Sequence, residues 1–342
     1  MSIKKFNFLP DFTVLSEWGQ KRQPFFALVD FDGNVAAAPV KWASPGPKTG
    51  VLREKVDFSG QNLHFQFYVA LHDKDPSIAA MDFHSRPTIL KITPPPKQQT
   101  VSAIQALQSQ LREGNSYLVN YCSQTFVELG QDLSSLYTQS TAPFTVWLEG
   151  QFMAFSPESF ITVMENQIST NPMKGTGFDA RLLLNDTKEQ AEHATVVDLL
   201  RNDLGQVARD IRLGDYRYLT AIPQADGRTL YQTSTEIKGT MPDDWRDHIG
   251  DWLPRLLPAG SVTGAPKKET VALIRRFETE PRGFFTGVAV LFDGECLYSC
   301  VLIRFLDLAG ETLKFRSGAG ITIYSDAEQE YEEILNKVYI PV

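Results

Sequence analysis

Short apolar runs that end at turn residues characterise the first ninety positions of the chain. One run covers residues 25–31 and stops at Asp32-Gly33, and another covers residues 63–71. Runs of this length are typical of strands, and Asp-Gly is a strong hairpin signal because its two-residue turn needs positive φ at both central positions. The pattern therefore predicts a β-rich N-terminal region with a hairpin at Asp32-Gly33.

A proline cluster then interrupts the series of strands and turns. Thr93-Pro94-Pro95-Pro96-Lys97 contains three consecutive residues that cannot donate backbone hydrogen bonds, which favours an extended spacer. We interpret it as a junction within a single domain of residues 1–342. It would separate an N-terminal β-rich subdomain, residues 1–92, from a catalytic core, residues 98–342.

Apolar residues recur at helical spacing directly after the prolines. Val101, Ile104, Leu107 and Leu111 predict a helix, and Gly114 stands at the position of its C-cap. Strand-like segments follow at residues 117–122, 144–148 and 160–164.

Two later segments predict further helices. One runs from about Lys188 to Leu204, and the other begins at Ser325, where Ser325 and Glu328 match a capping box. Because strands outnumber helices and do not alternate with them regularly, the sequence predicts a mixed α+β fold.

Composition and charge narrow the class of protein. The chain carries a net charge of -8 and has no basic run, so a nucleic-acid partner is not expected. No stretch reaches the roughly 18 consecutive apolar residues that a membrane span needs, and no signal peptide follows the basic N-terminus. Three cysteines are too few for a disulfide framework. We therefore expect a soluble, cytoplasmic protein with free thiols and no membrane partner.

A lysine between a proline and a glycine is the first candidate for chemistry. In Pro172-Met173-Lys174-Gly175-Thr176, the glycine permits close approach of a ligand and the threonine offers a hydroxyl. An isolated lysine is most often a solvated surface charge. To act as a nucleophile, the amine needs a pKa lowered from about 10.4 by burial or cationic neighbours. Nearby carboxylates would raise the pKa unless a bound cation offset them.

Four glutamates are candidate acids and metal ligands. Glu192 lies in the predicted helix of residues 188–204, and Glu158 stands at a turn. Glu330 and Glu333 share one stripe of the C-terminal helix with Lys337. Singly, such residues are usually solvated helix charges, but together they are the hard oxygen ligands that Mg²⁺ binds.

Two glycine-rich segments offer backbone N–H groups. Residues 258–267 lead into a helix, and residues 316–321 are predicted as a loop that follows a strand. Loops of this kind bind carboxylate or phosphate oxygens, although an isolated one is more often only a tight turn. Arg304, two residues before the predicted strand end at Leu306, is suited either to bidentate binding of a carboxylate or to a surface ion pair.

The order and spacing of these motifs resemble those of the chorismate-utilising enzymes over roughly residues 100–342. The motifs that carry the resemblance are Ser156-Pro157-Glu158, residues 172–176, residues 192–203, residues 258–267, Arg304, residues 317–321 and residues 325–337. The resemblance implies an α+β fold in which two face-packed antiparallel β-sheets are flanked by helices, with the active site between the sheets.

The resemblance also implies roles for individual residues. Glu192 and Glu330, with Glu333 close by, would hold Mg²⁺ as the cofactor, and Glu158 would be the general acid for a leaving hydroxyl. The residues expected to border or bind chorismate are Gly175, Thr176, Arg304, Gly318, Ala319, Gly320 and Lys337.

With a lysine at position 174, the motif resembles that of one branch of these enzymes, the aminodeoxychorismate synthases. Anthranilate synthases carry alanine at the same position of the motif. The implied reaction is attack by Lys174 on C2 of chorismate, followed by addition of ammonia at C4, on the route to 4-aminobenzoate and folate. A separate glutamine amidotransferase subunit would supply the ammonia. Isochorismate-forming relatives place a lysine base near the position of Leu118, so leucine there disfavours that branch. Anthranilate synthase, isochorismate synthase and a non-catalytic relative stay as alternatives.

Overall fold

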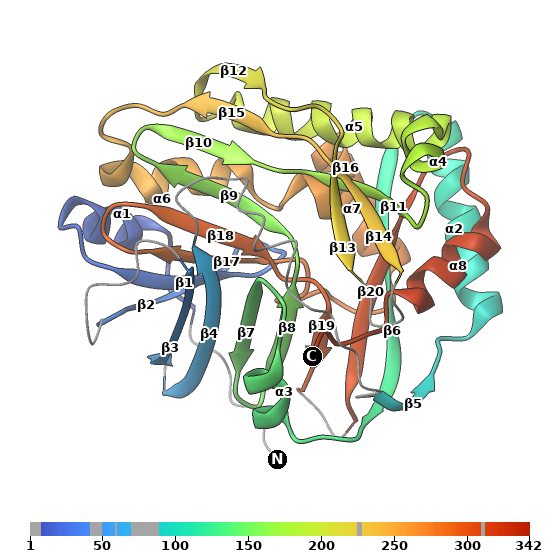
Figure 1. The fold of residues 1–342 in the computed structure, drawn as a ribbon, viewed down its shortest axis with the longest axis horizontal. Coiled ribbons are helices and arrows are strands. Elements are labelled where there is room, and N and C mark those ends of the chain that lie inside the picture. Colours follow the sequence, from blue (N-terminus) through green and yellow to red (C-terminus); the bar gives the residue numbers. More distant parts are fainter. Residues whose placement is uncertain (1–7, 42–49, 59, 70–88, 224–227, 309–311) are drawn as a thin grey trace.

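Two large antiparallel sheets form the centre of the computed structural model, which describes residues 8–41, 50–58, 60–69, 89–223, 228–308 and 312–342 (Figure 1). The first sheet has the order β12 (Arg209–Leu213), β15 (Ile237–Thr240), β10 (Gln167–Thr170), β9 (Ser159–Met164), β18 (Leu297–Val301), β17 (Val288–Phe292), β1 (Phe25–Val29), β2 (Val35–Pro39). The second has the order β16 (Gly264–Ala265), β6 (Leu118–Leu129), β20 (Lys314–Ile321), β19 (Phe305–Asp307), β8 (Phe152–Ser156), β7 (Phe144–Leu148), β4 (Gln61–Val69), β3 (Gly50–Phe58), with β5 (Ile89–Thr93) also on β6.

The two sheets pack face to face through a mainly apolar core. Phe26 of β1 stacks on Phe65 of β4 with ring centroids 4.4 Å apart, and Leu291 of β17 belongs to the same buried cluster. Strands buried on both faces read as continuous apolar runs, which is why residues 25–29 show no alternation. The α+β fold with two face-packed sheets is confirmed.

Helices cover the outer faces of both sheets. On the first sheet lie α1 (Thr13–Gln20), α5 (Thr187–Leu204) and α6 (Ile249–Trp252). On β6 and β20 of the second sheet lie α2 (Lys97–Arg112), α7 (Lys267–Phe277) and α8 (Ala327–Asn336), and α3 (Leu133–Gln139) packs farther along that sheet. None of the described helices is both long and apolar enough to cross a lipid bilayer.

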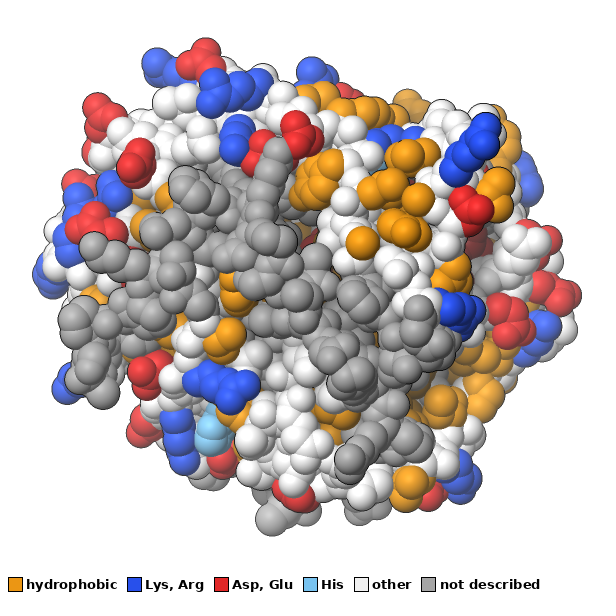
Figure 2. Space-filling model, in the orientation of Figure 1, with side chains coloured by type: hydrophobic (Ala, Val, Ile, Leu, Met, Phe, Trp, Pro, Cys, Tyr) orange, Lys and Arg blue, Asp and Glu red, His pale blue; other side chains and the backbone are white. Residues whose placement is uncertain are grey.

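A small third sheet stands apart from the two large ones. It consists of β11 (Met173–Gly177), β14 (Thr229–Ser234) and β13 (Tyr218–Pro223), and α4 (Ala180–Asn185) packs beside it. Hydrophobic side chains gather on the face of the molecule over these elements (Figure 2), where Phe178 and Leu182 are exposed. This sheet carries the Pro-Met-Lys-Gly-Thr motif.

The N-terminal region contributes strands to both large sheets. Phe26 of β1 pairs with Leu291 of β17, and Phe65 of β4 pairs with Val146 of β7. The proline cluster lies between β5 and α2. The division into an N-terminal subdomain and a catalytic core stays a prediction.

The helix predictions are largely confirmed. The helix predicted from Val101 to Leu111 is α2, and Gly114 follows it with a φ of 84°. The helix predicted from Lys188 to Leu204 is α5. All three cysteines are free, as expected.

The hairpin predicted at Asp32-Gly33 is confirmed, because β1 and β2 pair on either side of these residues, but two local details are wrong. The turn is wider than a two-residue one because Val29 pairs with Val35, and of the two turn residues only Gly33 has positive φ. The N-cap of α8 is Asp326, whose carboxylate accepts hydrogen bonds from the N–H groups of Glu328 and Gln329 at 3.0 and 2.9 Å. Ser325 instead accepts a hydrogen bond from the N–H of Thr322.

Candidate active site

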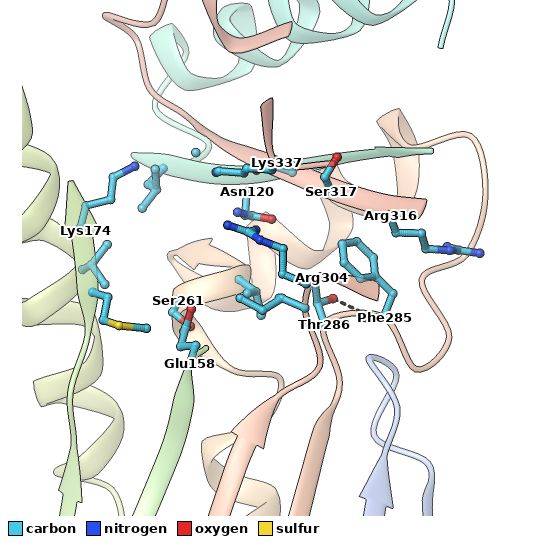
Figure 3. A pocket seen from close by; sticks show the side chains of 17 residues that line it. Asn120, Glu158, Lys174, Ser261, Phe285, Thr286, Arg304, Arg316, Ser317 and Lys337 are labelled. Carbon is cyan, nitrogen blue, oxygen red and sulfur yellow. Dashed lines mark hydrogen bonds between the residues drawn. The ribbon is translucent and has the colours of Figure 1, made fainter. Parts of the chain in front are cut away.

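A cavity of about 140 Å³ lies where the small sheet meets the ends of the large ones. Its walls come from β6, β11, β20, α5, residues 261–262, residues 285–286 and residues 303–304. Of the predicted site residues, the fold brings together on these walls Glu158, Lys174, Arg304, Gly318, Gly320 and Lys337 (Figure 3).

Lys174 reaches the cavity from β11. Its Nζ lies 2.7 Å from Oε2 of Glu192, and a Cβ added to Gly320 would lie 3.6 Å from the same nitrogen. The hydroxyl of Thr233 on β14 donates to the backbone carbonyl of Lys174, which fixes the strand that carries it. The amine therefore lies between helix α5 and strand β20, at the edge of the cavity.

The protonation state of Lys174 differs from the one that a nucleophile needs. Burial disfavours the charged amine, but the carboxylates of Glu192, Glu333 and Glu189 outweigh burial and raise the pKa of Lys174. The pKa of Lys174 therefore lies above its ordinary value, which is the direction expected for a lysine near carboxylates whose charge no cation offsets.

The carboxylates near Lys174 include one that the sequence analysis missed. Glu189 lies one helical turn before Glu192 on α5, and its Oε2 is buried without a hydrogen-bond partner among the residues that the structure describes. Burial raises the pKa of Glu189, and the negative charges of Glu192, Asp186 and Glu333 add to this effect, while Lys174 opposes it. The i, i+3 spacing of Glu189 and Glu192 was the available signal.

The predicted metal ligands are only partly assembled. Glu330 is buried on α8, and Glu333, one turn later, pairs with Lys337 at 2.7 Å. Within the described ranges, no three Asp, Glu, His or Cys side chains form a ready set of metal ligands. However, carboxylate oxygens are the donors that Mg²⁺ prefers, and the unpartnered oxygen of Glu189 fits a divalent cation. Magnesium binding stays a prediction.

Glu158 lines the cavity beside Ser261. It lies between β8 and β9, and the hydroxyl of Ser261 donates to its Oε1 at 2.5 Å. Burial raises the pKa of Glu158, and the Ser261 hydrogen bond and the charges of Arg304 and Lys337 only partly oppose this. A carboxyl group with a raised pKa retains its proton closer to neutral pH, as a general acid requires.

Ser261 was not singled out from the sequence, although it lies within the glycine-rich segment of residues 258–267. Lys267 at the end of that segment forms a part-buried ion pair with Asp203 of α5, with 2.8 Å between Nζ and Oδ2. Lys267 also donates to the carbonyl of Leu256. The ion pair thus connects α5 to the loop that presents Ser261 to Glu158.

Two cations occupy the side of the cavity opposite Lys174. Lys337 donates to the carbonyl of Gly318 at 2.8 Å and to Glu333 at 2.7 Å. Arg304 reaches into the cavity (Figure 3), and its buried Nε has no hydrogen-bond partner in the described part of the chain. The sequence predicts Arg304 inside a strand that ends at Leu306. In the structure Arg304 lies immediately before β19, and its φ is 50°.

The segment predicted as a glycine-rich loop, residues 316–321, is instead part of strand β20. Gly318 pairs with Cys122 and Gly320 with Asn120 of β6, whereas β19 pairs with β20 only as far as Arg316. Beyond that point the strand borders the cavity. A Cβ at Gly318 would lie 2.6 Å from Sγ of Cys122, so close packing is the reason for glycine there.

Three predicted substrate residues do not line the cavity. Gly175 follows Lys174 on β11 with a φ of 88°, and Thr176 is exposed. Ala319 is fully buried in the apolar cluster beneath α2 and α8. Gly175 has a different role, because a Cβ there would lie 2.8 Å from Oε2 of Glu189.

Comparisons with known proteins place this site in a family. The family model described as chorismate binding enzyme matches residues 60–341. An uncharacterized PabA-like protein of Haemophilus influenzae is 39% identical over 335 residues, which is 96% of this chain and 95% of that protein. Aminodeoxychorismate synthase component 1 of Escherichia coli is 28% identical over 262 residues, 71% of this chain and 56% of that protein.

Solved structures agree on the fold. The crystal structure of anthranilate synthase component I from Streptococcus pneumoniae superposes with a TM-score of 0.65 at 19% sequence identity and covers 98% of this chain and 82% of that one. At this identity the similarity concerns the fold alone. The family match spans most of the sequence and all the cavity residues, and the fold agrees with it. The chain therefore belongs to the chorismate binding enzyme family.

Proposed function

We propose that the protein is the component I subunit of an aminodeoxychorismate synthase. It would convert chorismate and ammonia to 4-amino-4-deoxychorismate, on the route to 4-aminobenzoate and folate. The observation that carries the proposal is the amine of Lys174 at the cavity wall, close to Gly320 and 2.7 Å from Glu192. A lysine at that point can form a bond to a ligand in the cavity.

Binding of chorismate would depend on the cationic side of the cavity. Chorismate carries two carboxylates, and the guanidinium of Arg304 and the ammonium of Lys337 both border the space. An arginine with an unpartnered N–H can bind a carboxylate through charge-assisted hydrogen bonds. These contacts would orient the ring with one face toward Lys174.

The chemistry would proceed in two substitutions. The Lys174 amine, after losing its proton to solvent, attacks C2 of chorismate, both conjugated ring double bonds shift by one position, and the C4–O bond breaks, so that the hydroxyl leaves as water with a proton from Glu158. Ammonia then attacks C4, both double bonds shift back, and the C2–N bond breaks with its electron pair going to the Lys174 nitrogen. The new C4 ammonium group returns a proton to Glu158, which restores both residues. Dividing one difficult substitution into two easier ones is the usual benefit of covalent catalysis.

Glu192, Glu330 and Glu333, together with Glu189, would hold the Mg²⁺ ion. When bound, the ion supplies positive charge to the departing hydroxyl and offsets the carboxylate charge that keeps Lys174 protonated. A glutamine amidotransferase subunit would deliver the ammonia.

The nearest alternatives are anthranilate and isochorismate synthases. Lys174 favours the proposed reaction over the first, since the resemblance gives anthranilate synthases alanine there. Leu118 lines the cavity at the position where isochorismate-forming relatives would need a lysine base, and a leucine cannot activate water. An intact set of Lys174, Glu158 and Arg304 around a cavity speaks against a non-catalytic relative.

The test is product identification with chorismate, Mg²⁺ and ammonium salt, followed by mass spectrometry of enzyme quenched during turnover. We expect 4-amino-4-deoxychorismate and a covalent adduct on Lys174. Anthranilate or isochorismate as the product would reject the proposal. An absent adduct, with the expected product formed, would reject only the covalent route.

A further inference from the structure

We infer that Tyr339 is a positioning residue for Arg304 and sets the plane in which the guanidinium meets a substrate carboxylate. The inference rests on the proposed function only in taking chorismate as the ligand. Tyr339 lies outside the cavity wall, so it acts through Arg304 and not by touching the substrate.

Two contacts join the side chains. The guanidinium carbon of Arg304 lies 4.7 Å from the centre of the Tyr339 ring, and one terminal nitrogen of Arg304 lies 3.3 Å from the tyrosine hydroxyl. A guanidinium at this distance from an aromatic ring is held by a cation–π interaction. Both contacts leave the Nε of Arg304 unpartnered among the residues that the structure describes.

The backbone holds Tyr339 in place for this contact. Its neighbours Val338 and Ile340 are buried in the apolar cluster that contains Phe155 and Phe315. Tyr339 itself is 41% exposed, so its ring contributes little to that core. The side chain is therefore available for a role other than packing, two residues after the cavity lysine Lys337.

The geometry matters because a guanidinium binds carboxylates in its own plane. Its N–H groups form a rigid planar fork, and bidentate binding requires the fork and the carboxylate to be coplanar. A ring beside the guanidinium restricts rotation of the fork and leaves its edge open. Arg304 follows a residue at the cavity wall and has a φ of 50°, so the backbone also constrains where its side chain begins.

The experiment measures the dissociation constant of chorismate by titration calorimetry, without Mg²⁺ and without ammonia so that neither substitution proceeds, for Tyr339→Phe, Tyr339→Leu and Tyr339→Ala. Phenylalanine retains the ring, so we expect its constant to stay within about twofold of the unaltered protein. Leucine and alanine lose the ring and should raise the constant by about three- to tenfold. Tyr324→Ala is the matched control, because Tyr324 is 83% exposed on the turn before α8.

A double-mutant cycle separates positioning from a general structural effect. In an Arg304→Ala background, Tyr339→Leu should change the constant by less than about twofold, because the group it orients is gone. An equal loss in both backgrounds, or no loss with Tyr339→Leu and Tyr339→Ala, would overturn the inference.

The outcomes distinguish this inference from the proposed function. If the unaltered protein makes 4-amino-4-deoxychorismate while both ring-free variants bind chorismate normally, only the role of Tyr339 is rejected. If it binds chorismate in a Tyr339-dependent manner but forms another product, only the proposed reaction is rejected.

Discussion

The two sides of the cavity carry opposite charge. On the side of β11 and α5, Glu189 and Glu192 act on the ammonium of Lys174. On the side of β19 and α8, Arg304 and Lys337 border the cavity and act together on the carboxyl of Glu158. The difference suggests a division of labour: Lys174 on the first side would perform the chemistry with Glu158 as the acid and with a cation held by carboxylates of α5 and α8, while Arg304 and Lys337 would bind the anionic substrate. Substitutions of Lys174, Glu158 or the cation ligands should then change kcat, and those of Arg304 and Lys337 should change KM.

The largest effect is expected from Lys174→Ala. Loss of the nucleophile should lower kcat by at least roughly 10³-fold, as it does when a covalent group is removed from other enzymes. Steady-state kinetics with chorismate and ammonium salt checks this. Lys267→Ala is not a suitable control, because Lys267 forms an ion pair with Asp203 of α5. Lys21→Ala, on the exposed end of α1, is suitable. A kcat within tenfold of the original would reject the covalent role.

Arg304→Ala tests the opposite side. A charge-assisted hydrogen bond contributes about 1.5–3 kcal/mol, so KM for chorismate should rise by about 10- to 150-fold while kcat changes much less. Initial rates over a wide range of chorismate concentration measure both constants. A fall in kcat with an unchanged KM would contradict the proposed division.

Glu189→Gln addresses the carboxylate that the sequence analysis missed. If Glu189 helps to hold Mg²⁺, the concentration of Mg²⁺ needed for half-maximal activity should rise by about 10-fold or more, with a small change in KM for chorismate. Activity titrated against Mg²⁺ measures this. Gln190→Ala, on the exposed face of the same helix, is the control.

Ser261→Ala should give the smallest effect, on the pH dependence of kcat. The Ser261 hydrogen bond lowers the pKa of Glu158, so its removal should raise that pKa further. A general acid is active while protonated, and activity falls as pH rises through its pKa. The alkaline limb of the profile should therefore move to higher pH. A shift to lower pH, or none, would contradict the assignment of Glu158 as the acid.

Local sequence patterns predicted the helices better than the strand that carries Gly318 and Gly320. Helix α2 depends on residues three and four apart, which are visible in sequence. Strand β20 forms by pairing with β6, nearly two hundred residues earlier. Glycine is needed at position 318 because a larger side chain would clash with Cys122 of β6. No local pattern reports such a contact.

The candidate site shows the same limit. Lys174, Glu158, Arg304 and Lys337 could be chosen from motif order, and the fold brings them to one cavity. The direction of the pKa shift of Lys174 could be predicted from nearby carboxylates. The contributions of Glu189 and Glu333 could not, because they depend on how α5 and α8 pack around the lysine. The role of Tyr339 could not be predicted either, because it depends on the path of the chain after α8.

The glycine after Lys174 limits how this enzyme could be redesigned. Position 175 combines a backbone conformation that side chains rarely adopt with only 2.8 Å between a Cβ and a carboxylate oxygen of Glu189. Position 174 has no such restriction. A library intended to change the reaction should therefore vary the lysine and leave its neighbour fixed, since a side chain at position 175 would strain the backbone and push against the Glu189 carboxylate before it tested any new chemistry.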